Sequence, residues 1–358
     1  MRVVVTGATG NVGTSLLDSL TADSAVDTIV GLARRVPTAR GPAEQRWGRR
    51  VEWVAADVVT TELAPILAGA DAVVHLAWLI QPSRRPEVLR ATNVVGSDRV
   101  FAAAAQAGVR TLVYASSIGA YSPGPKDEAV DESWPTGGID TSFYARHKSA
   151  VERSLDSFEA AHPDIRVVRL RPALIFKREA ASGIRRLFLG HLVPPRILRP
   201  SLIPVVPRTE RLVFQAVHTS DVAEAYRLAL LRDDARGAFN LAADPVLDGE
   251  QLAEVLRARA VPVPAAVLRL GAQASWRLHL QPTPEGWIDM AVSVPVMDTS
   301  RARRELEWSP RVSAGDALLD LRDGFAHRAE APTPALARRA PAVRDDEDRE
   351  AMAVGDSA

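Results

Sequence analysis

The sequence predicts an α/β fold built on a doubly wound parallel sheet, with a smaller lobe toward the C-terminus. Apolar runs of strand length alternate with helical patterns through the first half of the chain, which is typical of βαβ units. The first run, residues 3–6, leads directly into a glycine-rich turn and then a helical pattern at residues 12–20. With 358 residues, of which 47% are apolar, the chain is long enough for one large domain with an appendage.

The remaining elements follow in the same alternating order. Strands are expected at residues 28–33, 51–55, 72–76, 111–115 and 165–170, and helices at residues 61–67, 87–107 and 142–161. Parallel strands need crossover connections, which these helices supply. The six expected strands are enough for a sheet of the Rossmann type.

The domain organisation follows from where this regularity stops. After Arg171-Pro172 the sequence becomes rich in Pro and Arg up to about residue 207, and strand-like runs return at residues 212–217 and 238–241. We expect a Rossmann domain, a substrate-binding lobe over the carboxyl ends of its strands, and a disordered tail without apolar periodicity. Their expected bounds are 1–172 with a returning segment 211–244, then 173–210 with 245–327, and 328–358.

Composition excludes several classes of function. Lys+Arg and Asp+Glu number 44 each, so no net charge favours nucleic acid or an anionic membrane. The absence of Cys removes disulfides, thiolate catalysis and Cys-ligated metals, and no cluster of His and carboxylates has metal-ligand spacing. The apolar stretches are too short to span a bilayer, and the first strand leaves no room for a signal peptide. We therefore expect a cytoplasmic protein without a metal.

The turn after the first strand is a candidate dinucleotide-binding loop with GxxGxxG spacing. It reads Thr6-Gly7-Ala8-Thr9-Gly10-Asn11-Val12-Gly13. Gly7 and Gly10 meet the need for positive φ and for close approach of the backbone to a pyrophosphate, while Gly13 would let helix and strand pack closely. The helix N-terminus offers free N–H groups to phosphates. An ordinary tight βα turn is the alternative interpretation.

The end of the second strand bears on the choice of cofactor. An NAD site normally has an acid there, but the sequence reads Ala33-Arg34-Arg35. Two guanidinium groups could hold the 2′-phosphate of NADP, so NADP is favoured and NAD remains possible. Alternatively, Arg34 and Arg35 are solvated surface residues. Asp57, after the third strand, is a candidate for binding the adenine edge or for capping a turn.

A second group of residues has the chemistry of proton transfer. Tyr144 and Lys148 are four residues apart, so a helix would place them on one face. A phenol titrates near ~10, and a nearby ammonium group would lower that pKa and let Tyr144 act as an acid or base. Lys148 could also bind the nicotinamide ribose. Ser116 and Ser117 end the fifth strand, where a hydroxyl could hold a substrate oxygen or cap a turn.

Together these motifs resemble those of the extended short-chain dehydrogenase/reductases, in the NAD-dependent epimerase/dehydratase group. The resemblance covers about residues 1–326 and includes Asp57-Val58, His75-Leu76-Ala77, Asn93 to Gly96, Arg171-Pro172, His218 to Ala223, Asp298-Thr299-Ser300 and Leu306 to Pro310. It implies that Ser117, Tyr144 and Lys148 are catalytic, that Asn93 helps to order the site, and that a homodimer forms through the helices at 87–107 and 142–161. It also implies that the cofactor site includes Asp57, Val58, Leu76, Ala77, Tyr144, Lys148 and Pro172.

Two departures from the family pattern refine the functional prediction. Ile118 and Gly119 replace the acidic pair that the 4,6-dehydratases carry, and Ala33 replaces the acid that retains NAD in epimerases. We therefore expect an NADP-dependent carbonyl reductase or alcohol dehydrogenase acting on a small molecule. A nucleotide-sugar 4-epimerase and a non-catalytic dinucleotide sensor are the alternatives.

Aromatic and histidine residues near these motifs have open roles. Four aromatic side chains could line a pocket for an apolar or ring-shaped substrate, or pack in the core: Trp78, Phe143, Trp276 and Trp287. His147 is expected to be exposed on its helix, and His75 to be buried with one ring nitrogen satisfied.

Overall fold

The centre of the molecule is a seven-stranded parallel sheet. The computed structural model describes residues 1–38, 40–189, 205–327 and 329–337. The strand order is β11-β7-β5-β4-β1-β2-β3, and every neighbouring pair is parallel. The strands are β1 (Arg2–Thr6), β2 (Thr28–Ala33), β3 (Val51–Ala55), β4 (Ala72–His75), β5 (Thr111–Ala115), β7 (Arg166–Pro172) and β11 (Gly237–Leu241). The Rossmann-type fold predicted from the sequence is confirmed.

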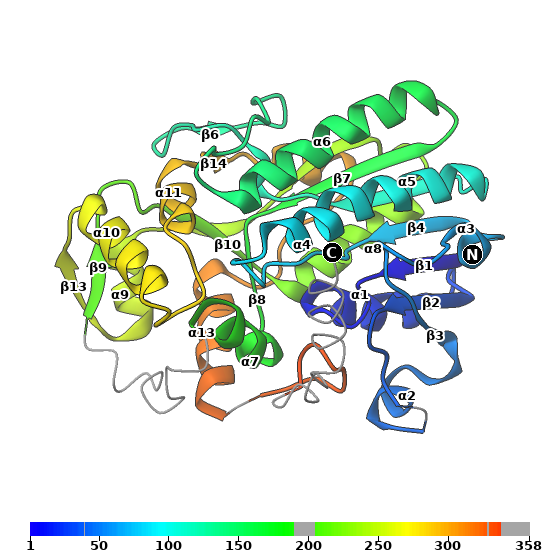
Figure 1. Cartoon of the computed structure of the whole chain (residues 1–358), viewed down its shortest axis with the longest axis horizontal. Coiled ribbons are helices and arrows are strands. Elements are labelled where there is room, and N and C mark those ends of the chain that lie inside the picture. Colours follow the sequence, from blue (N-terminus) through cyan, green and yellow to red (C-terminus); the bar gives the residue numbers. More distant parts are fainter. Residues whose placement is uncertain (39, 190–204, 328, 338–358) are drawn as a thin grey trace, which may run out of the picture.

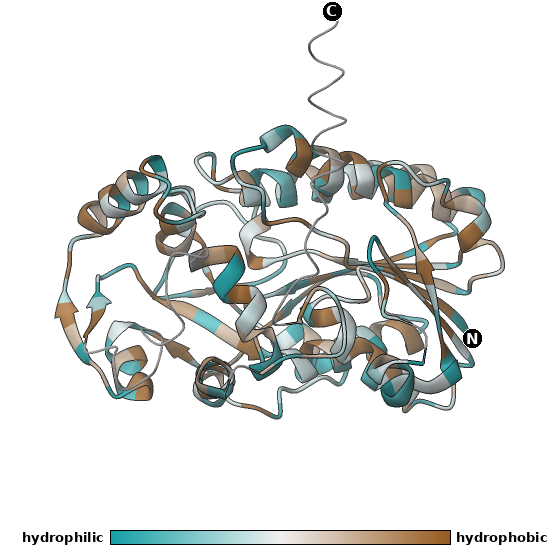
Figure 2. Ribbon diagram, turned by 60° about the horizontal axis from the view of Figure 1, so that its bottom comes forward, coloured by the Kyte–Doolittle hydropathy of each residue, from teal (hydrophilic) through white to brown (hydrophobic). Residues whose placement is uncertain are grey.

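The apolar run at residues 3–5 explains why β1 occupies the middle of this sheet. All three valines are fully buried, as expected for a strand covered on both faces. Val4 lies opposite Val30 of β2 and Val73 of β4. Figure 2 shows the hydrophobic colouring of the central strands between helices of mixed polarity.

Helices cover both faces of the sheet, as Figure 1 shows for α5 and α6 on one side and α1 on the other. One core cluster joins the sheet to α1 (Asn11–Thr21), α8 (Thr219–Leu231) and α12 (Ser300–Glu305). The opposite cluster joins it to α3 (Ala64–Leu67), α5 (Gly96–Gln106) and α6 (Phe143–Ala161). Because β1 has β2 on one side and β4 on the other, a crevice opens at the carboxyl ends of β1 and β4, where open α/β sheets bind ligands.

The helix expected at residues 87–107 is divided into three parts. It consists of α4 (Pro86–Arg90), a π-helical turn at Ala91–Val95, and α5. The Ser97 hydroxyl donates a hydrogen bond of 2.7 Å to the carbonyl of Asn93, inside the π turn. π turns of this kind are often found at functional sites, and this one carries Asn93.

The rest of the chain forms small sheets and helices beside the main sheet. Three strands, β8 (Leu174–Phe176), β10 (Phe214–His218) and β12 (Ala243–Leu247), form one sheet. The pairs are β9 (Val205–Arg208) with β13 (Arg259–Pro262), and β6 (Ala129–Val130) with β14 (Val296–Met297). The helices are α2 (Pro42–Trp47), α7 (Ala181–Ile184), α9 (Gly249–Leu256), α10 (Ala265–Arg277), α11 (Gly286–Ser293) and α13 (Ala314–His327).

The expected domain bounds can be compared with these elements. Segment 211–244 supplies β11 to the seven-stranded sheet but β10 to the three-stranded sheet. Residues 300–308, expected in the lobe, pack into the main core through Ala302, Leu306 and Trp308. Residues 190–204, expected in the lobe, lie outside the described residues. No helix in the described ranges is long and apolar enough to cross a membrane.

Residues 329–337, which we call the C-terminal strap, depart from the expected disorder of residues 328–358. Thr333 and Leu336 are buried, and the Thr333 hydroxyl donates a hydrogen bond of 2.8 Å to the carbonyl of Thr9. This contact and the apolar burial give the segment a fixed place on the glycine loop, which its composition did not indicate. Residues 328 and 338–358 lie outside the described residues.

Candidate active site

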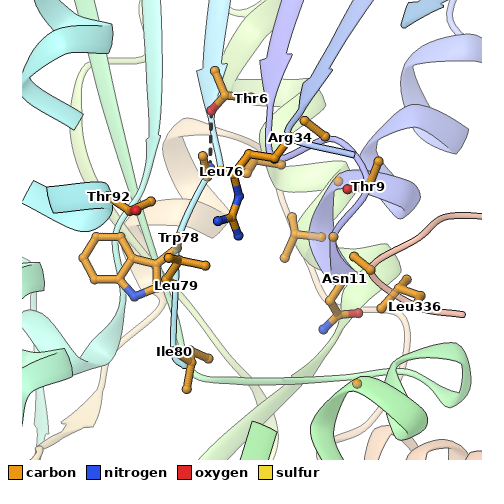
Figure 3. Close-up of a pocket in the computed structure, with 18 of the residues that line it drawn as sticks. Thr6, Thr9, Asn11, Arg34, Leu76, Trp78, Leu79, Ile80, Thr92 and Leu336 are labelled. Carbon is orange, nitrogen blue, oxygen red and sulfur yellow. Dashed lines mark hydrogen bonds between the residues drawn. The ribbon is translucent and has the colours of Figure 1, made fainter. Parts of the chain in front are cut away.

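A cavity of about 460 Å³ lies at the carboxyl ends of β1, β2, β3 and β4. Figure 3 shows Thr9, Asn11, Arg34, Leu76, Trp78 and Leu336 around it. It brings together twelve of the fifteen residues predicted to bind cofactor: Gly7, Thr9, Gly10, Asn11, Val12, Gly13, Arg34, Arg35, Asp57, Val58, Leu76 and Ala77. The other three, Tyr144, Lys148 and Pro172, are not among its lining residues.

The glycine loop packs so closely against neighbouring backbone that any other residue at Gly7 or Gly13 would collide with it. Gly7 has φ +71°, and a Cβ there would lie 2.8 Å from the backbone between Leu76 and Ala77. A Cβ on Gly13 would lie 2.6 Å from the carbonyl oxygens of Gly7 and Ala8. Gly10, expected to need positive φ, instead has φ −80° and precedes α1 without a side-chain cap. The N–H groups of the first turn of α1 therefore remain available to an anion in the cavity.

The end of β2 makes the cavity cationic. Arg34 and Arg35 are exposed and line it, and Ala33 stands where an acid would hold a ribose hydroxyl. Figure 3 shows the Arg34 guanidinium directed into the cavity. Within the described part of the chain, Asp57 is the one carboxylate that lines this cavity. Its Oδ1 accepts a hydrogen bond of 2.8 Å from the Val59 N–H. Asp57 thus forms a turn while lining the cavity.

Asn93 orders the segment that follows β4. Its side chain is fully buried. The Asn93 amide donates a hydrogen bond of 2.8 Å to the carbonyl of Leu79, and its oxygen accepts one of 2.7 Å from the Leu79 N–H. This two-way bond fixes residues 76–80, which form one wall of the cavity. The arrangement agrees with the ordering role predicted for Asn93.

Both ring nitrogens of His75, rather than the one expected, are satisfied. Nδ1 lies 2.7 Å from the Thr6 hydroxyl, and Nε2 lies 2.9 Å from the Ser97 hydroxyl. Burial lowers the pKa of His75 to about 3, with a smaller contribution from Lys148. A neutral His75 thus connects β1, β4 and α5 below the cavity.

The three predicted catalytic side chains come from β5 and α6. Ser117 follows β5, and its hydroxyl accepts a hydrogen bond of 3.1 Å from the Gly119 N–H at the start of the 3-10 turn Ile118–Ala120. Tyr144 and Lys148 lie in the first two turns of α6, which begins after Ser142 as N-cap. The Lys148 ammonium is buried and donates a hydrogen bond of 2.6 Å to the carbonyl of Ala115.

The ionisation of Tyr144 and Lys148 differs from the sequence-based expectation. Burial raises the pKa of Tyr144, and a hydrogen bond with Ser117 opposes that shift only in part. Lys148, expected to lower this pKa, lies 5.7 Å from the centre of the Tyr144 ring, and burial brings its own pKa well below the usual range. Tyr144 is therefore protonated near neutral pH, as a proton donor must be.

Ser116 has a separate, structural role. Its hydroxyl donates a hydrogen bond of 2.5 Å to Glu152, a buried carboxylate of α6. Arg171 binds both oxygens of Glu152 at 2.9 and 3.0 Å, and Arg169 binds one at 3.0 Å. These charged bonds hold the pKa of Glu152 at about 2 despite its burial. They connect α6 to β5 and β7, and so position the helix that carries Tyr144.

Aromatic side chains surround Tyr144. Its ring centre lies 5.1 Å from that of Trp287 and 5.8 Å from that of Trp78. Phe143 and Phe188 pack against Trp287, and the Lys148 ammonium lies 3.5 Å from the centre of the Trp78 ring. Three of the four predicted aromatic residues therefore meet here, which suits an apolar substrate or one with a ring.

Two of the singled-out residues lie otherwise than expected. Trp276 packs under the Arg84 guanidinium, whose carbon is 4.5 Å from its ring centre, and makes no ring contact with the Tyr144 group. His147 is half-buried rather than exposed, because the first turns of α6 face the cleft. Burial lowers the pKa of His147 to about 4, and its ring lies 6.0 Å from that of Phe143.

Sequence reasoning missed two contributors to the cavity. Arg186, in the π-helical turn Arg185–Leu189, lines it from the small lobe. Ala335 and Leu336 of the C-terminal strap line it as well, and Figure 3 shows Leu336 beside Asn11. Neither segment carries a motif or an apolar period, so the sequence held no local signal for these residues.

Known proteins resemble the chain over most of its length. It is 28% identical over 345 residues to a UDP-glucose 4-epimerase of Mycolicibacterium smegmatis, covering 92% of the chain and 100% of that protein. It is 24% identical over 349 residues to a 4-hydroxy-2-methyl-3-oxo-4-farnesyl-3,4-dihydroquinoline-1-oxide ketoreductase of Stigmatella aurantiaca, covering 90% and 96%.

Solved structures share the fold. UDP-glucose 4-epimerase from Thermotoga maritima superposes with a TM-score of 0.68 at 20% identity, covering 92% of this chain and 99% of that one. Residues 3–242 match the NAD dependent epimerase/dehydratase family. Because this match covers more than half of its length, the chain belongs to the NAD-dependent epimerase/dehydratase family and is an NAD(P)-dependent enzyme of the hydride-transfer type.

Proposed function

We propose that this enzyme is an NADP-dependent carbonyl reductase, which also acts as an alcohol dehydrogenase in reverse. The observation that carries the proposal is the cationic end of the cavity. Arg34 and Arg35 line it, and Ala33 lacks the acid that would hold an unphosphorylated ribose. A cofactor bound there without such an acid is expected to dissociate between turnovers, as a reductase requires.

The cavity fits a dinucleotide. The free N–H groups of the first turn of α1 suit a diphosphate, and Gly7 and Gly13 allow the tight loop that leads into this turn. Leu76, Ala77 and Asn11 would lie along the cofactor, and Asp57 beside its adenosine end. When bound, the nicotinamide supplies a hydride to the substrate carbon in reduction, or accepts one in oxidation.

The side chains of the protein would then carry out the proton transfer. In reduction, the Tyr144 hydroxyl gives its proton to the carbonyl oxygen as the carbon receives the hydride and its electron pair, so that an alcohol forms. Ser117 would hold that oxygen by a hydrogen bond, and Lys148 would stabilise the tyrosinate left behind. The raised pKa keeps the Tyr144 hydroxyl protonated near neutral pH, so its proton is present for this step.

A binding titration tests the cofactor preference. NADPH and NADH are titrated into the apo-protein and into the Arg34→Ala, Arg35→Ala double variant, with fluorescence as the readout. We expect tighter binding of NADPH by the parent chain, with the preference lost in the variant. Tighter binding of NADH by the parent, or NAD retained through purification, would contradict the proposal.

A nucleotide-sugar 4-epimerase is the second candidate. The named activity of the Mycolicibacterium smegmatis relative, which matches the chain over 92% of its length, favours it. In an epimerase the hydride returns to the opposite face of the same sugar carbon, so no net oxidation occurs. Conversion of UDP-glucose to UDP-galactose without added cofactor would support this function over the reductase.

We also propose a cytoplasmic homodimer with α5 and α6 at the interface. The two helices contact each other on one side of the sheet (Figure 1), and Val95 beside α5 is an exposed apolar residue. Light scattering after size exclusion measures the mass in solution. A monomer at micromolar concentration would contradict the dimer.

A further inference from the structure

A third guanidinium group lines the cavity together with Arg34 and Arg35. Arg186 lines it from the π-helical turn of the small lobe. Its Nη2 donates a hydrogen bond of 2.7 Å to the main-chain carbonyl of Ala335 in the C-terminal strap. Within the described ranges, none of these three arginines has a carboxylate as an ion-pair partner.

Arg35 and Arg185 lie close enough to Arg186 to affect its charge. Burial lowers the pKa of Arg186, and repulsion from Arg35 and then Arg185 lowers it further. Like charges gathered at a partly buried site are unfavourable unless an anion binds there. The carbonyl of Ala335 fixes the guanidinium but leaves its charge intact, so the strap orients Arg186 without neutralising it.

The place of the cluster indicates which anion it would bind. The diphosphate of a dinucleotide has its own donors in the glycine loop and the first turn of α1. Arg34 and Arg35 instead follow β2, at the end of the cavity where an adenosine ribose binds in sheets of this type. The strap lines the same cavity: Thr333 binds the carbonyl of Thr9, next to Ala8, whose N–H bonds to Leu32 of β2, and Ala335 binds Arg186.

We propose that Arg186, positioned by the carbonyl of Ala335, joins Arg34 and Arg35 in binding the 2′-phosphate of NADP. This inference rests on the proposed preference for NADP. It assigns to the small lobe and the strap a share of the cofactor specificity, and it makes Arg186 a binding residue and Ala335 a positioning residue.

Calorimetric titration of the intact protein tests the assignment without turnover. The probes are 2′,5′-ADP, which carries the 2′-phosphate, and AMP, which lacks it. In Arg186→Gln we expect the affinity for 2′,5′-ADP to fall about tenfold or more, as for loss of a charge-assisted bond, with AMP binding changed less than about twofold. Arg178→Gln, at an exposed arginine of the same lobe outside the cavity, is the matched control and should change neither.

The role of the strap is tested by two shortened chains. A chain ending at Glu330 lacks Thr333 and the carbonyl that holds Arg186, whereas a chain ending at Ala337 keeps both. We expect only the shorter chain to lose affinity for 2′,5′-ADP. Adding Arg186→Gln to it should then cause little further loss, because both changes act on the same interaction.

Each outcome bears on the inference. An equal loss of AMP and 2′,5′-ADP in Arg186→Gln would overturn it, since Arg186 would then act on the shared part of the ligands or on folding. Unchanged 2′,5′-ADP binding in that variant would overturn it as well. If the affinity for 2′,5′-ADP were nevertheless lost in the Arg34, Arg35 double variant, the proposed NADP preference would still hold. If the parent chain binds both probes alike, the proposed NADP preference fails and this inference fails with it.

Discussion

Proton transfer at the candidate site depends on the protonation of two side chains, Tyr144 and Lys148. The hydroxyl of Tyr144 is hydrogen-bonded with Ser117, and burial keeps its proton in place. Lys148, the expected source of a lowered pKa, is itself buried, bound to the Ala115 carbonyl and stacked on Trp78. Burial therefore keeps Tyr144 protonated, and the aromatic side chains packed against it, Trp78 and Trp287, are far from it in the sequence.

Replacing Tyr144 should separate chemistry from binding. In Tyr144→Phe the ring still packs against Trp287 but no proton can be donated, so kcat for ketone reduction should fall by about 10²–10⁴. The dissociation constant for NADPH, measured by fluorescence, should change less than about twofold. A variant that keeps most of its kcat would show that another group donates the proton.

The glycine loop offers a second test at the scale of one atom. Gly13→Ala places a methyl group 2.6 Å from two carbonyl oxygens of the loop, so the loop must shift and cofactor binding should weaken greatly. Gly271→Ala is the control, because a Cβ there meets nothing within 4 Å and lies within α10. That change should raise stability by about 0.4–1 kcal/mol. Equal NADPH affinity in both variants would contradict the proposed role of the loop.

At the scale of elements, the position of α6 controls the site. This helix carries Tyr144 and Lys148 near its start and Glu152 further along, so one rigid element connects the catalytic pair to the charged cluster beneath it. Glu152 bonds to Ser116, Arg169 and Arg171, which lie on or after β5 and in β7. Movement of α6 would break all of these bonds together.

We therefore expect Glu152→Ala to be far more harmful than removal of a neighbouring exposed carboxylate. It removes the carboxylate that binds buried Arg171 and one of the three that bind buried Arg169, so it should lower the free energy of unfolding by about 3–5 kcal/mol. Asp156→Ala removes another bond to Arg169, but the Asp156 side chain is 65% exposed, so the loss should be about 1 kcal/mol or less. Urea unfolding measures both. Equal losses would show that the buried cluster does not hold the helix.

Local sequence patterns predicted the elements and residues whose signals lie within one short segment. The glycine loop follows its strand directly, and Tyr144 and Lys148 share one helix, so spacing was sufficient. Arg186 and Leu336 could not be found this way, because they meet the glycine loop only through tertiary packing. The pKa of Tyr144 and the burial of His147 were likewise set by neighbours that no local pattern identifies, such as Trp287 and Phe143.

For the whole molecule, the buried histidines set the response to acid. His75 has a pKa of about 3 in the fold against 6.5 when exposed. Above pH 6.5 it is neutral in both states and has no effect. As the pH falls below 6.5 the unfolded chain binds the proton more readily, so stability is lost until the pH reaches about 3. His147 acts in the same direction down to about 4.

The free energy of unfolding should therefore fall between pH 6.5 and pH 4, by up to about 1.4 kcal/mol per pH unit for each of the two groups. Urea titrations at a series of pH values measure this slope. In His75→Asn the slope should decrease, whatever the change in stability at pH 7. A slope that stays the same would mean that His75 does not titrate between these states.

The bond between Thr333 and the Thr9 carbonyl should affect how long a dinucleotide stays bound rather than its affinity. Because the strap lies on the glycine loop beside the cavity, we expect it to slow the release of a bound dinucleotide. Thr333→Val removes the bond and should shorten the residence time of NADPH severalfold in a stopped-flow displacement experiment. Thr21→Val, which removes a hydroxyl bonded within α1, should leave it unchanged. Where product release is fast, opening of the strap would set the turnover rate of the enzyme.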